Sequence, residues 1–146
     1  MIILPDVNVL VYAFREGAEQ HERYRSWLDE LLDSQDDLLL VEAVLVSVVR
    51  IVTNPRIADP PAATARALDF VAALRDAPRA RAAQPSAAVW AALQGFVDED
   101  RMIRANLVPD AYLASVATSH RASVATADRG FARFAAVRWF DPANLD

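Results

Sequence analysis

The sequence has no cysteine among its 146 residues. This absence excludes disulfides, thiolate metal ligands and cysteine nucleophiles. It agrees with a reducing compartment, so we expect a cytoplasmic protein. There are only two histidines, and a zinc site would therefore need acids for most of its ligands, which is uncommon.

Lysine is also absent, because all fifteen basic residues are arginine. A phosphate-binding P-loop needs its lysine and Schiff-base catalysis needs an amine, so both are excluded. The haloacid-dehalogenase fold and the response-regulator receiver also place an aspartate after the first strand. Both use a lysine partner, and the absence of lysine removes them as interpretations.

Long apolar runs are missing too, and none approaches the length of a membrane span. The apolar start at residues 1–4 meets Pro5 and Asp6 too early for a secretory signal. The net charge of −5 argues against binding nucleic acid through overall charge, so a polyanionic substrate would need a metal ion or a local basic patch. The length and the 54% apolar content predict a single domain over residues 1–146.

Apolar runs alternate with amphipathic segments, which predicts an α/β fold with a parallel sheet. The segment 43–52 is ambiguous, because its valines favour strand while its length and polar interruptions allow a buried helix; we predict helix. Residues 98–106 are expected to form a loop or a fraying helix end. The expected strands are 2–4, 38–41, 80–83, 123–126 and 137–140, and the expected helices are 7–14, 19–33, 63–75, 86–97 and a last one from Pro109.

Four acids, Asp6, Glu42, Asp110 and Asp128, stand at element boundaries. Each alone fits a local role as an N-cap, a first-turn acid or an Asx-turn residue. Three of them follow expected strands, whose carboxyl ends meet at one edge of an open sheet, and Asp110 would join them from a helix start. Carboxylates gathered in this way repel one another unless a cation lies between them. Oxygen ligands select Mg²⁺ or Mn²⁺, and such ions promote phosphodiester hydrolysis.

Several segments, in order and with their spacing kept, resemble the motifs of PIN-domain ribonucleases, and more narrowly those of VapC toxins of type II toxin–antitoxin pairs. The resemblance covers nearly the whole chain. It rests on LPDVNVL and the following Tyr12-Ala13, on Val41-Glu42, and on the segments 50–56, 106–114, 125–134 and 138–142.

The resemblance implies a PIN-like three-layer sandwich, with a short parallel sheet flanked by helices. It implies an endoribonuclease that depends on Mg²⁺ or Mn²⁺, hydrolyses RNA with metal-activated water and acts as a toxin. Asp6 and Asp128 would be central metal ligands, and Asp110 would hold metal directly or through water. Glu42 would bind metal or position the attacking water.

The resemblance also assigns supporting residues and partners. Asn8 and Thr126 match positions that orient the acids. Homodimers and a VapB-type antitoxin, whose C-terminal segment enters the site, are expected. Many members carry a further acid where this chain has Gly130, so one resting metal ion is favoured over two.

Arginines and tryptophans supply further candidates. Arg129 and Arg133 lie nearest in sequence to a proposed ligand and are candidates for binding RNA phosphate. Arg15, Arg50 and Arg56 are weaker candidates, and for every one of these arginines a solvated face or an ion pair is an equal interpretation. Core packing or a partner groove is favoured over base stacking for Trp27 and Trp90.

Two other functions stay open. One is a catalytically weak binding module that sequesters an antitoxin. The other is a structure-selective DNA nuclease, against which the small size and the lack of a clamp insertion count.

Overall fold

The computed structural model describes residues 1–145. Within them, five parallel strands form one sheet in the order β3-β2-β1-β4-β5. The strands are β1 (Ile2–Pro5), β2 (Asp37–Leu40), β3 (Ala80–Ala82), β4 (Ser123–Ala125) and β5 (Trp139–Phe140). No helix in this described part of the chain combines the length and hydropathy needed to cross a membrane.

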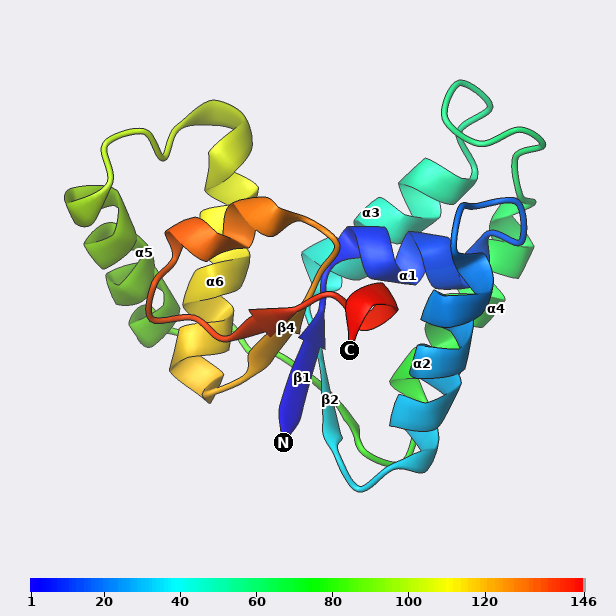
Figure 1. The fold of residues 1–146 in the computed structure, drawn as a ribbon, viewed down its shortest axis with the longest axis horizontal. Coiled ribbons are helices and arrows are strands. Elements are labelled where there is room, and N and C mark those ends of the chain that lie inside the picture. The colour runs from blue at the N-terminus through cyan, green and yellow to red at the C-terminus, as the bar shows by residue number, and fades with distance from the viewer. Residues whose placement is uncertain (146) are drawn as a thin grey trace.

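Helices cover the sheet on both sides (Figure 1). α5 and α6 pack together on one side, while α1, α2, α3 and α4 gather on the other. The helices are α1 (Val7–Phe14), α2 (His21–Asp33), α3 (Glu42–Val52), α4 (Thr64–Arg75), α5 (Ala87–Glu99) and α6 (Val108–His120), with short 3-10 turns η1 (Ala105–Leu107), η2 (Arg129–Arg133) and η3 (Pro142–Asn144). The expected α/β fold, a short parallel sheet flanked by helices, is thereby confirmed.

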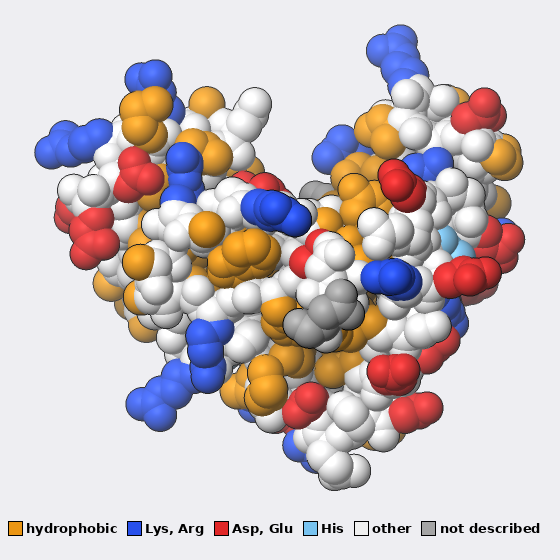
Figure 2. Space-filling view, viewed as in Figure 1, with side chains coloured by type: hydrophobic (Ala, Val, Ile, Leu, Met, Phe, Trp, Pro, Cys, Tyr) orange, Lys and Arg blue, Asp and Glu red, His pale blue; other side chains and the backbone are white. Residues whose placement is uncertain are grey.

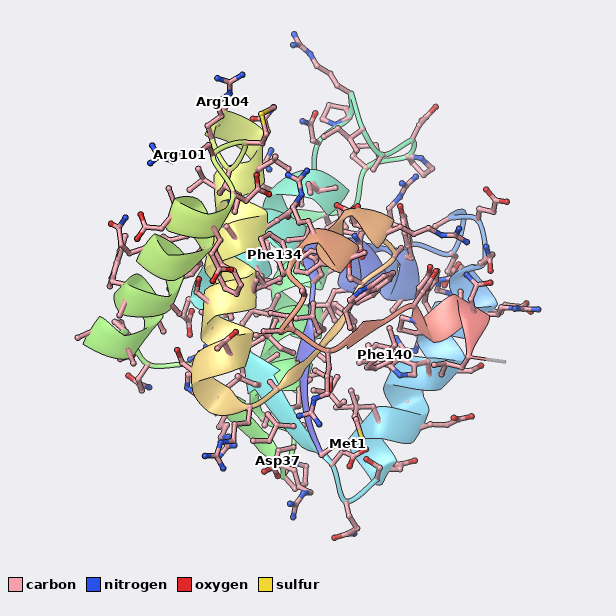
Figure 3. The ribbon with its side chains drawn as sticks, turned by 60° about the vertical axis from the view of Figure 1, so that its left-hand side comes forward. Met1, Asp37, Arg101, Arg104, Phe134 and Phe140 are labelled. Atoms are coloured by element: carbon pink, nitrogen blue, oxygen red, sulfur yellow. The ribbon has the colours of Figure 1, made fainter. Side chains whose placement is uncertain are left out.

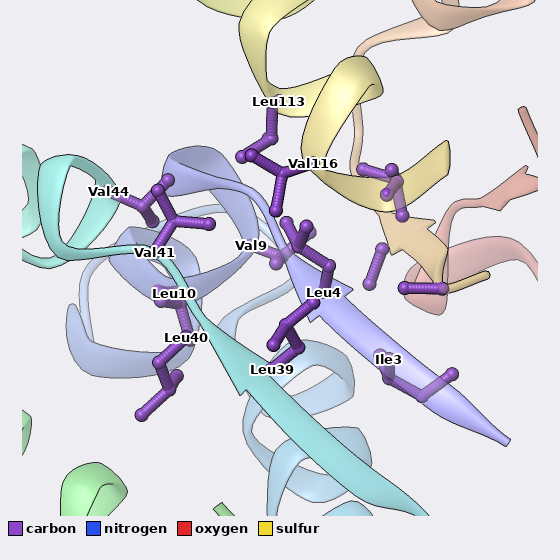
Figure 4. Packing of buried hydrophobic residues seen from close by; sticks show 14 of the residues in the cluster. Ile3, Leu4, Val9, Leu10, Leu39, Leu40, Val41, Val44, Leu113 and Val116 are labelled. Carbon is purple, nitrogen blue, oxygen red and sulfur yellow. The ribbon is translucent and has the colours of Figure 1, made fainter. Parts of the chain in front are cut away.

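The core fixes where the strands end. Leu4 of β1 and Leu39 of β2 are almost fully buried, and they pack near Val9 of α1 and Val116 of α6 (Figure 4). Burial of each leucine contributes about 1.5–3 kcal/mol, so the registers of the central strands are strongly specified. The carboxyl ends of β1, β2 and β4 therefore meet at one edge of the sheet.

The opposite ends of the molecule differ in chemistry. Met1 and Asp37 lie where β1 and β2 begin, and Arg101 and Arg104 stand at the far end, beyond α5 (Figure 3). Asp37 is neutralised by Arg79, whose Nη2 lies 2.7 Å from its Oδ1. Local ion pairs thus lie at the amino ends of β1 and β2. The candidate acids lie toward the carboxyl ends.

The helix prediction for 43–52 is confirmed, because Val44, Leu45, Val48 and Val52 are buried at helical spacing and override the strand propensity of valine. Several predicted boundaries are wrong. β2 is 37–40 instead of 38–41, since residue 41 is already the N-cap of α3. β5 has two residues instead of four. Residues 98–106 were expected to be a loop or a fraying helix end; 98–99 are indeed the end of α5, and 105–106 belong to η1.

Candidate functional site

Asp6 lies at the junction of β1 and α1 and is the N-cap of the helix. Its Oδ1 accepts a 2.7 Å hydrogen bond from the Val7 amide, and its own amide donates to the Ala125 carbonyl of β4 at 2.9 Å. The residue is only 8% exposed. Asp6 therefore does cap α1, but burying its carboxylate destabilises the folded chain more than a solvent-exposed N-cap would.

Asn8 and Thr126 orient the Asp6 carboxylate. The Thr126 hydroxyl donates to Asp6 Oδ2 at 2.8 Å, and Asn8 Nδ2 donates to the same oxygen at 3.3 Å. Asn8 Oδ1 accepts from the Ala127 amide at 3.0 Å, and Thr126 Oγ1 accepts from the Asp128 amide at 3.0 Å. The network ties the end of β1 to the end of β4 and agrees with the orienting role that the sequence predicts for both residues.

Three aspartates from different elements share one electrostatic environment. Burial raises the pKa of Asp6 against the lowering effect of its hydrogen bonds with Thr126 and Val7, and the Asp128 charge raises it further. The pKa of Asp110, near the start of α6, is raised to about 6 by burial and then by the charges of Asp6 and Asp128. The structure thus brings these three acids within range of one another.

The carboxylate of Asp128 is held by Gly130, the residue that stands where many members of the resembled family carry a further acid. Asp128 Oδ1 accepts from the Gly130 amide at 2.8 Å. A Cβ at position 130 would lie 2.9 Å from that oxygen, so any side chain there would force the carboxylate to move. Gly130 therefore permits the present orientation of Asp128, a contact that the sequence pattern did not reveal.

Glu42 is the first residue of α3 and is exposed. It is not among the charges that shift the pKa values of Asp6 and Asp110. Among residues 1–145, no group of three or more histidine, aspartate or glutamate side chains is arranged to hold a metal ion as the side chains stand. The four-ligand set of Asp6, Glu42, Asp110 and Asp128 stays a prediction.

Of the two arginine candidates, Arg133 has a charge that acts on one of the acids. Its charge lowers the pKa of Asp110 against the other influences, and its Nε lies 4.0 Å from Asp100 Oδ2. Arg129 is exposed at the start of η2. Phosphate binding by Arg129 and Arg133 stays a prediction, although Arg133 is well placed for it.

A groove of about 850 Å³ adjoins the acids and is bounded by α1, α3, α5 and α6. The surface is notched between two lobes, one carrying α5 and the other carrying α3 and α4, with arginine side chains at the top of both (Figure 2). The lining of the groove combines acids, arginines, aromatic rings and aliphatic side chains, among them Asp6, Asp110, Arg15, Arg50, Trp90 and Tyr112.

The two tryptophans compared at the sequence level differ. Trp27 is half-buried, with its ring 6.1 Å from that of Phe140. Trp90 is 64% exposed, so core packing is wrong for it. Its ring lies 6.3 Å from that of Tyr112. Tyr112 also lines the groove, and nothing in the sequence marks it as a groove residue.

The comparisons with known proteins agree on one family. Residues 3–137 match the PIN domain family. The chain is 39% identical to the VapC ribonuclease Mb2897 of Mycobacterium bovis over 139 residues, which cover 95% of this chain and 94% of that protein. It is 36% identical to ribonuclease VapC31 of Mycobacterium tuberculosis over 141 residues, covering 97% and 99%. The solved structure of VapBC2 from Rickettsia felis, bound to a DNA fragment from its promoter, shares the fold with a TM-score of 0.71 at 17% identity, covering 97% of this chain and 98% of that one.

Proposed function

Because the chain belongs to the PIN-domain family and is related to VapC ribonucleases along nearly its whole length, we propose that it is a metal-dependent endoribonuclease. It would hydrolyse RNA phosphodiesters with Mg²⁺ or Mn²⁺ and act as the toxin of a toxin–antitoxin pair. The relatives' ribonuclease names support nuclease activity. The metal requirement rests on the chemistry of this chain's own acids.

The observation that carries the proposal is the coupling of Asp6, Asp110 and Asp128. Burial and mutual repulsion raise the pKa values of Asp6 and Asp110, and a divalent cation between the carboxylates would relieve that repulsion. Carboxylate oxygens are the donors that Mg²⁺ and Mn²⁺ prefer. The donor set thus fits a hard cation in its chemistry.

Each of the three aspartates has a separate task in the proposed site. Asp6 is fixed by Val7, Asn8 and Thr126 and would provide a rigid ligand. Asp128 has one oxygen on the Gly130 amide and the other free of any hydrogen bond within residues 1–145. Asp110 would hold the ion directly or through water.

The chain also has to manage the charge of the substrate. A bound Mg²⁺ or Mn²⁺ would supply positive charge for the attacking and leaving oxygens of the phosphodiester. Glu42 would bind metal or position the attacking water, and Arg129 and Arg133 would hold RNA phosphate. An acidic protein thereby binds an acidic substrate through local cations.

The proposed partners follow the structural relatives. Among them are VapBC structures from Rickettsia felis and Haemophilus influenzae and Fit structures, one of them from Neisseria gonorrhoeae. We therefore propose a VapB-type antitoxin as the cognate partner. We also propose a homodimer, which the family resemblance implies, and a cytoplasmic location, which the absence of cysteine suits.

The test is cleavage by purified protein freed of antitoxin. RNA should be cut with Mg²⁺ or Mn²⁺ and left intact with EDTA. Asp128→Asn should lose cleavage, while the matched variant Asp69→Asn, on the exposed face of α4, should retain it. Cleavage that survives EDTA or Asp128→Asn would contradict the metal mechanism. Failure to cut any RNA would support the binding module, and cutting of DNA alone would support the DNA nuclease.

A further inference from the structure

Two arginines in the groove keep their charges unpaired within the described part of the chain. Arg15 ends α1 as its C-cap, and Arg50 lies in the last turn of α3. Both line the cavity that contains Asp6 and Asp110, and neither takes part in an ion pair between residues 1 and 145. The arginines that do so are Arg25, Arg66, Arg79, Arg81 and Arg133.

The opposite wall of the groove carries an aromatic pair. Trp90 of α5 and Tyr112 of α6 have ring centroids 6.3 Å apart at an interplanar angle of 54°, and both line the same cavity. Trp90 leaves 64% of its surface exposed, although water is an unfavourable environment for an indole ring. A flat aromatic surface is therefore available beside the acids.

These walls face one another across the candidate site. Asp6 precedes α1, on the arginine wall, and Asp110 is part of α6, on the aromatic wall. Unpaired guanidinium groups form bidentate contacts with phosphate. Exposed aromatic rings stack on splayed nucleobases. The groove thus combines cations, acids and aromatic rings, which are the groups that a strand of nucleic acid and its metal ion would contact.

We propose that this groove grips RNA on both sides of the cleavage position, with Arg15 and Arg50 on backbone phosphate and the Trp90–Tyr112 pair on a base. The inference rests on the proposed ribonuclease function and adds the binding residues. RNA fits better than an apolar partner because the groove contains two unpaired cations as well as aromatic rings. It also explains how a chain of net charge −5 holds a polyanion.

The arginine half is tested by salt dependence. Fluorescently labelled single-stranded RNA is titrated with the full chain in EDTA, where no cleavage is expected, at several salt concentrations. Each phosphate contact contributes about −0.7 to the slope of log K against log salt. Arg15→Ala and Arg50→Ala should each reduce the slope by about that amount, and Arg75→Ala, at the remote end of α4, should leave it unchanged. Equal slopes for all three variants would overturn the proposal.

The aromatic half is tested by pairing variants with abasic RNA. Trp90→Ala should weaken binding about 5- to 100-fold, and Trp90→Phe should restore most of it. One abasic position in the RNA should weaken binding to the wild type and have little further effect on Trp90→Ala. Leu68→Ala, which removes another exposed apolar side chain, is the matched control. Additive losses from the abasic position and Trp90→Ala would overturn the stacking.

A second copy of the chain is the competing occupant of Trp90. If Trp90→Ala turned a dimer into a monomer in light scattering while each site kept its RNA affinity, the ring would belong to a self-interface and the proposal would fail. The outcomes also separate the two proposals. If the wild-type protein neither binds nor cuts RNA, the proposed ribonuclease function is wrong. If it binds and cuts RNA but the arginine and tryptophan substitutions leave binding unchanged, only the proposed RNA-binding residues are wrong.

Discussion

Replacing Asp6 by asparagine separates its two roles, because the substitution removes the charge and keeps the cap. The new Oδ1 can still accept from the Val7 amide, as Asp6 Oδ1 does at 2.7 Å. The new amide nitrogen replaces Oδ2 and cannot accept from the Thr126 hydroxyl or from Asn8 Nδ2, as Asp6 Oδ2 does at 2.8 Å and 3.3 Å. Two hydrogen bonds are lost, which costs about 1–3 kcal/mol.

That loss is offset by the removal of a buried charge, since burial disfavours the ionised form and raises the pKa of Asp6. We expect Asp6→Asn to change the free energy of unfolding by less than about 2 kcal/mol, which is a Tm shift below roughly 8 °C for a chain of this size. Its cleavage rate should fall about 10³-fold, for a loss of about 4 kcal/mol of charge stabilisation in the transition state.

The assay measures RNA cleavage per folded molecule, with circular dichroism melting as the check on folding. Asp141→Asn is the control, because Asp141 also caps a short helix and accepts from the Tyr24 hydroxyl at 2.9 Å and the Ala143 amide at 3.0 Å. It should lose stability and keep cleavage. A folded Asp6→Asn protein that cut RNA within tenfold of the wild-type rate would refute the reasoning and leave Asp6 as an N-cap only.

Three further predictions follow from the same contacts. Thr126→Val should lower the free energy of unfolding by about 1–3 kcal/mol in urea, because it removes a buried donor to Asp6 and an acceptor for the Asp128 amide; an unchanged midpoint would contradict this. Gly130→Ala should raise the Mn²⁺ concentration for half-maximal cleavage about 2- to 10-fold, since it displaces the Asp128 oxygen from its orienting amide, whereas Gly95→Ala, with open space around it, should have no effect. The pKa of Asp110 is raised from 3.8 to about 6 in the folded chain. In EDTA, its contribution to stability should therefore be fully present below pH 3.8 and be lost as the pH rises through about 6. If the urea midpoint of Asp110→Asn followed the wild-type midpoint across this pH window, the prediction would be wrong.

The sequence was sufficient to predict that Asp6 and Asp128 lie near each other, because that prediction depends on sheet topology alone. A parallel sheet brings the carboxyl ends of its strands to one edge, and this is enough to bring Asp6 and Asp128 into range of each other. The same reasoning could not orient a single carboxylate. The hydrogen bond from Thr126 to Asp6 and those that join Asn8 to Thr126 and Ala127 connect the end of β1 with the end of β4, and no local pattern encodes them.

Two kinds of error have a physical origin. Strand ends were misplaced by one residue or more because apolar side chains such as Val41 serve equally well in a strand and in the cap that follows it. Core packing or a partner groove was favoured for Trp90 because it lies on an apolar helix face, and the core-packing alternative is wrong because the side chain is 64% exposed. Periodicity identifies which residues share a face, but what lies opposite that face is decided by tertiary packing.

If Asp6, Asp110 and Asp128 hold a divalent cation, anomalous diffraction from crystals grown with Mn²⁺ should show a manganese peak within ligating distance of carboxylate oxygens from at least two of these aspartates. The peak should be lost in Asp6→Asn crystals. A well-ordered wild-type structure with no peak between them, or with manganese only elsewhere, would mean that these aspartates do not form the metal site.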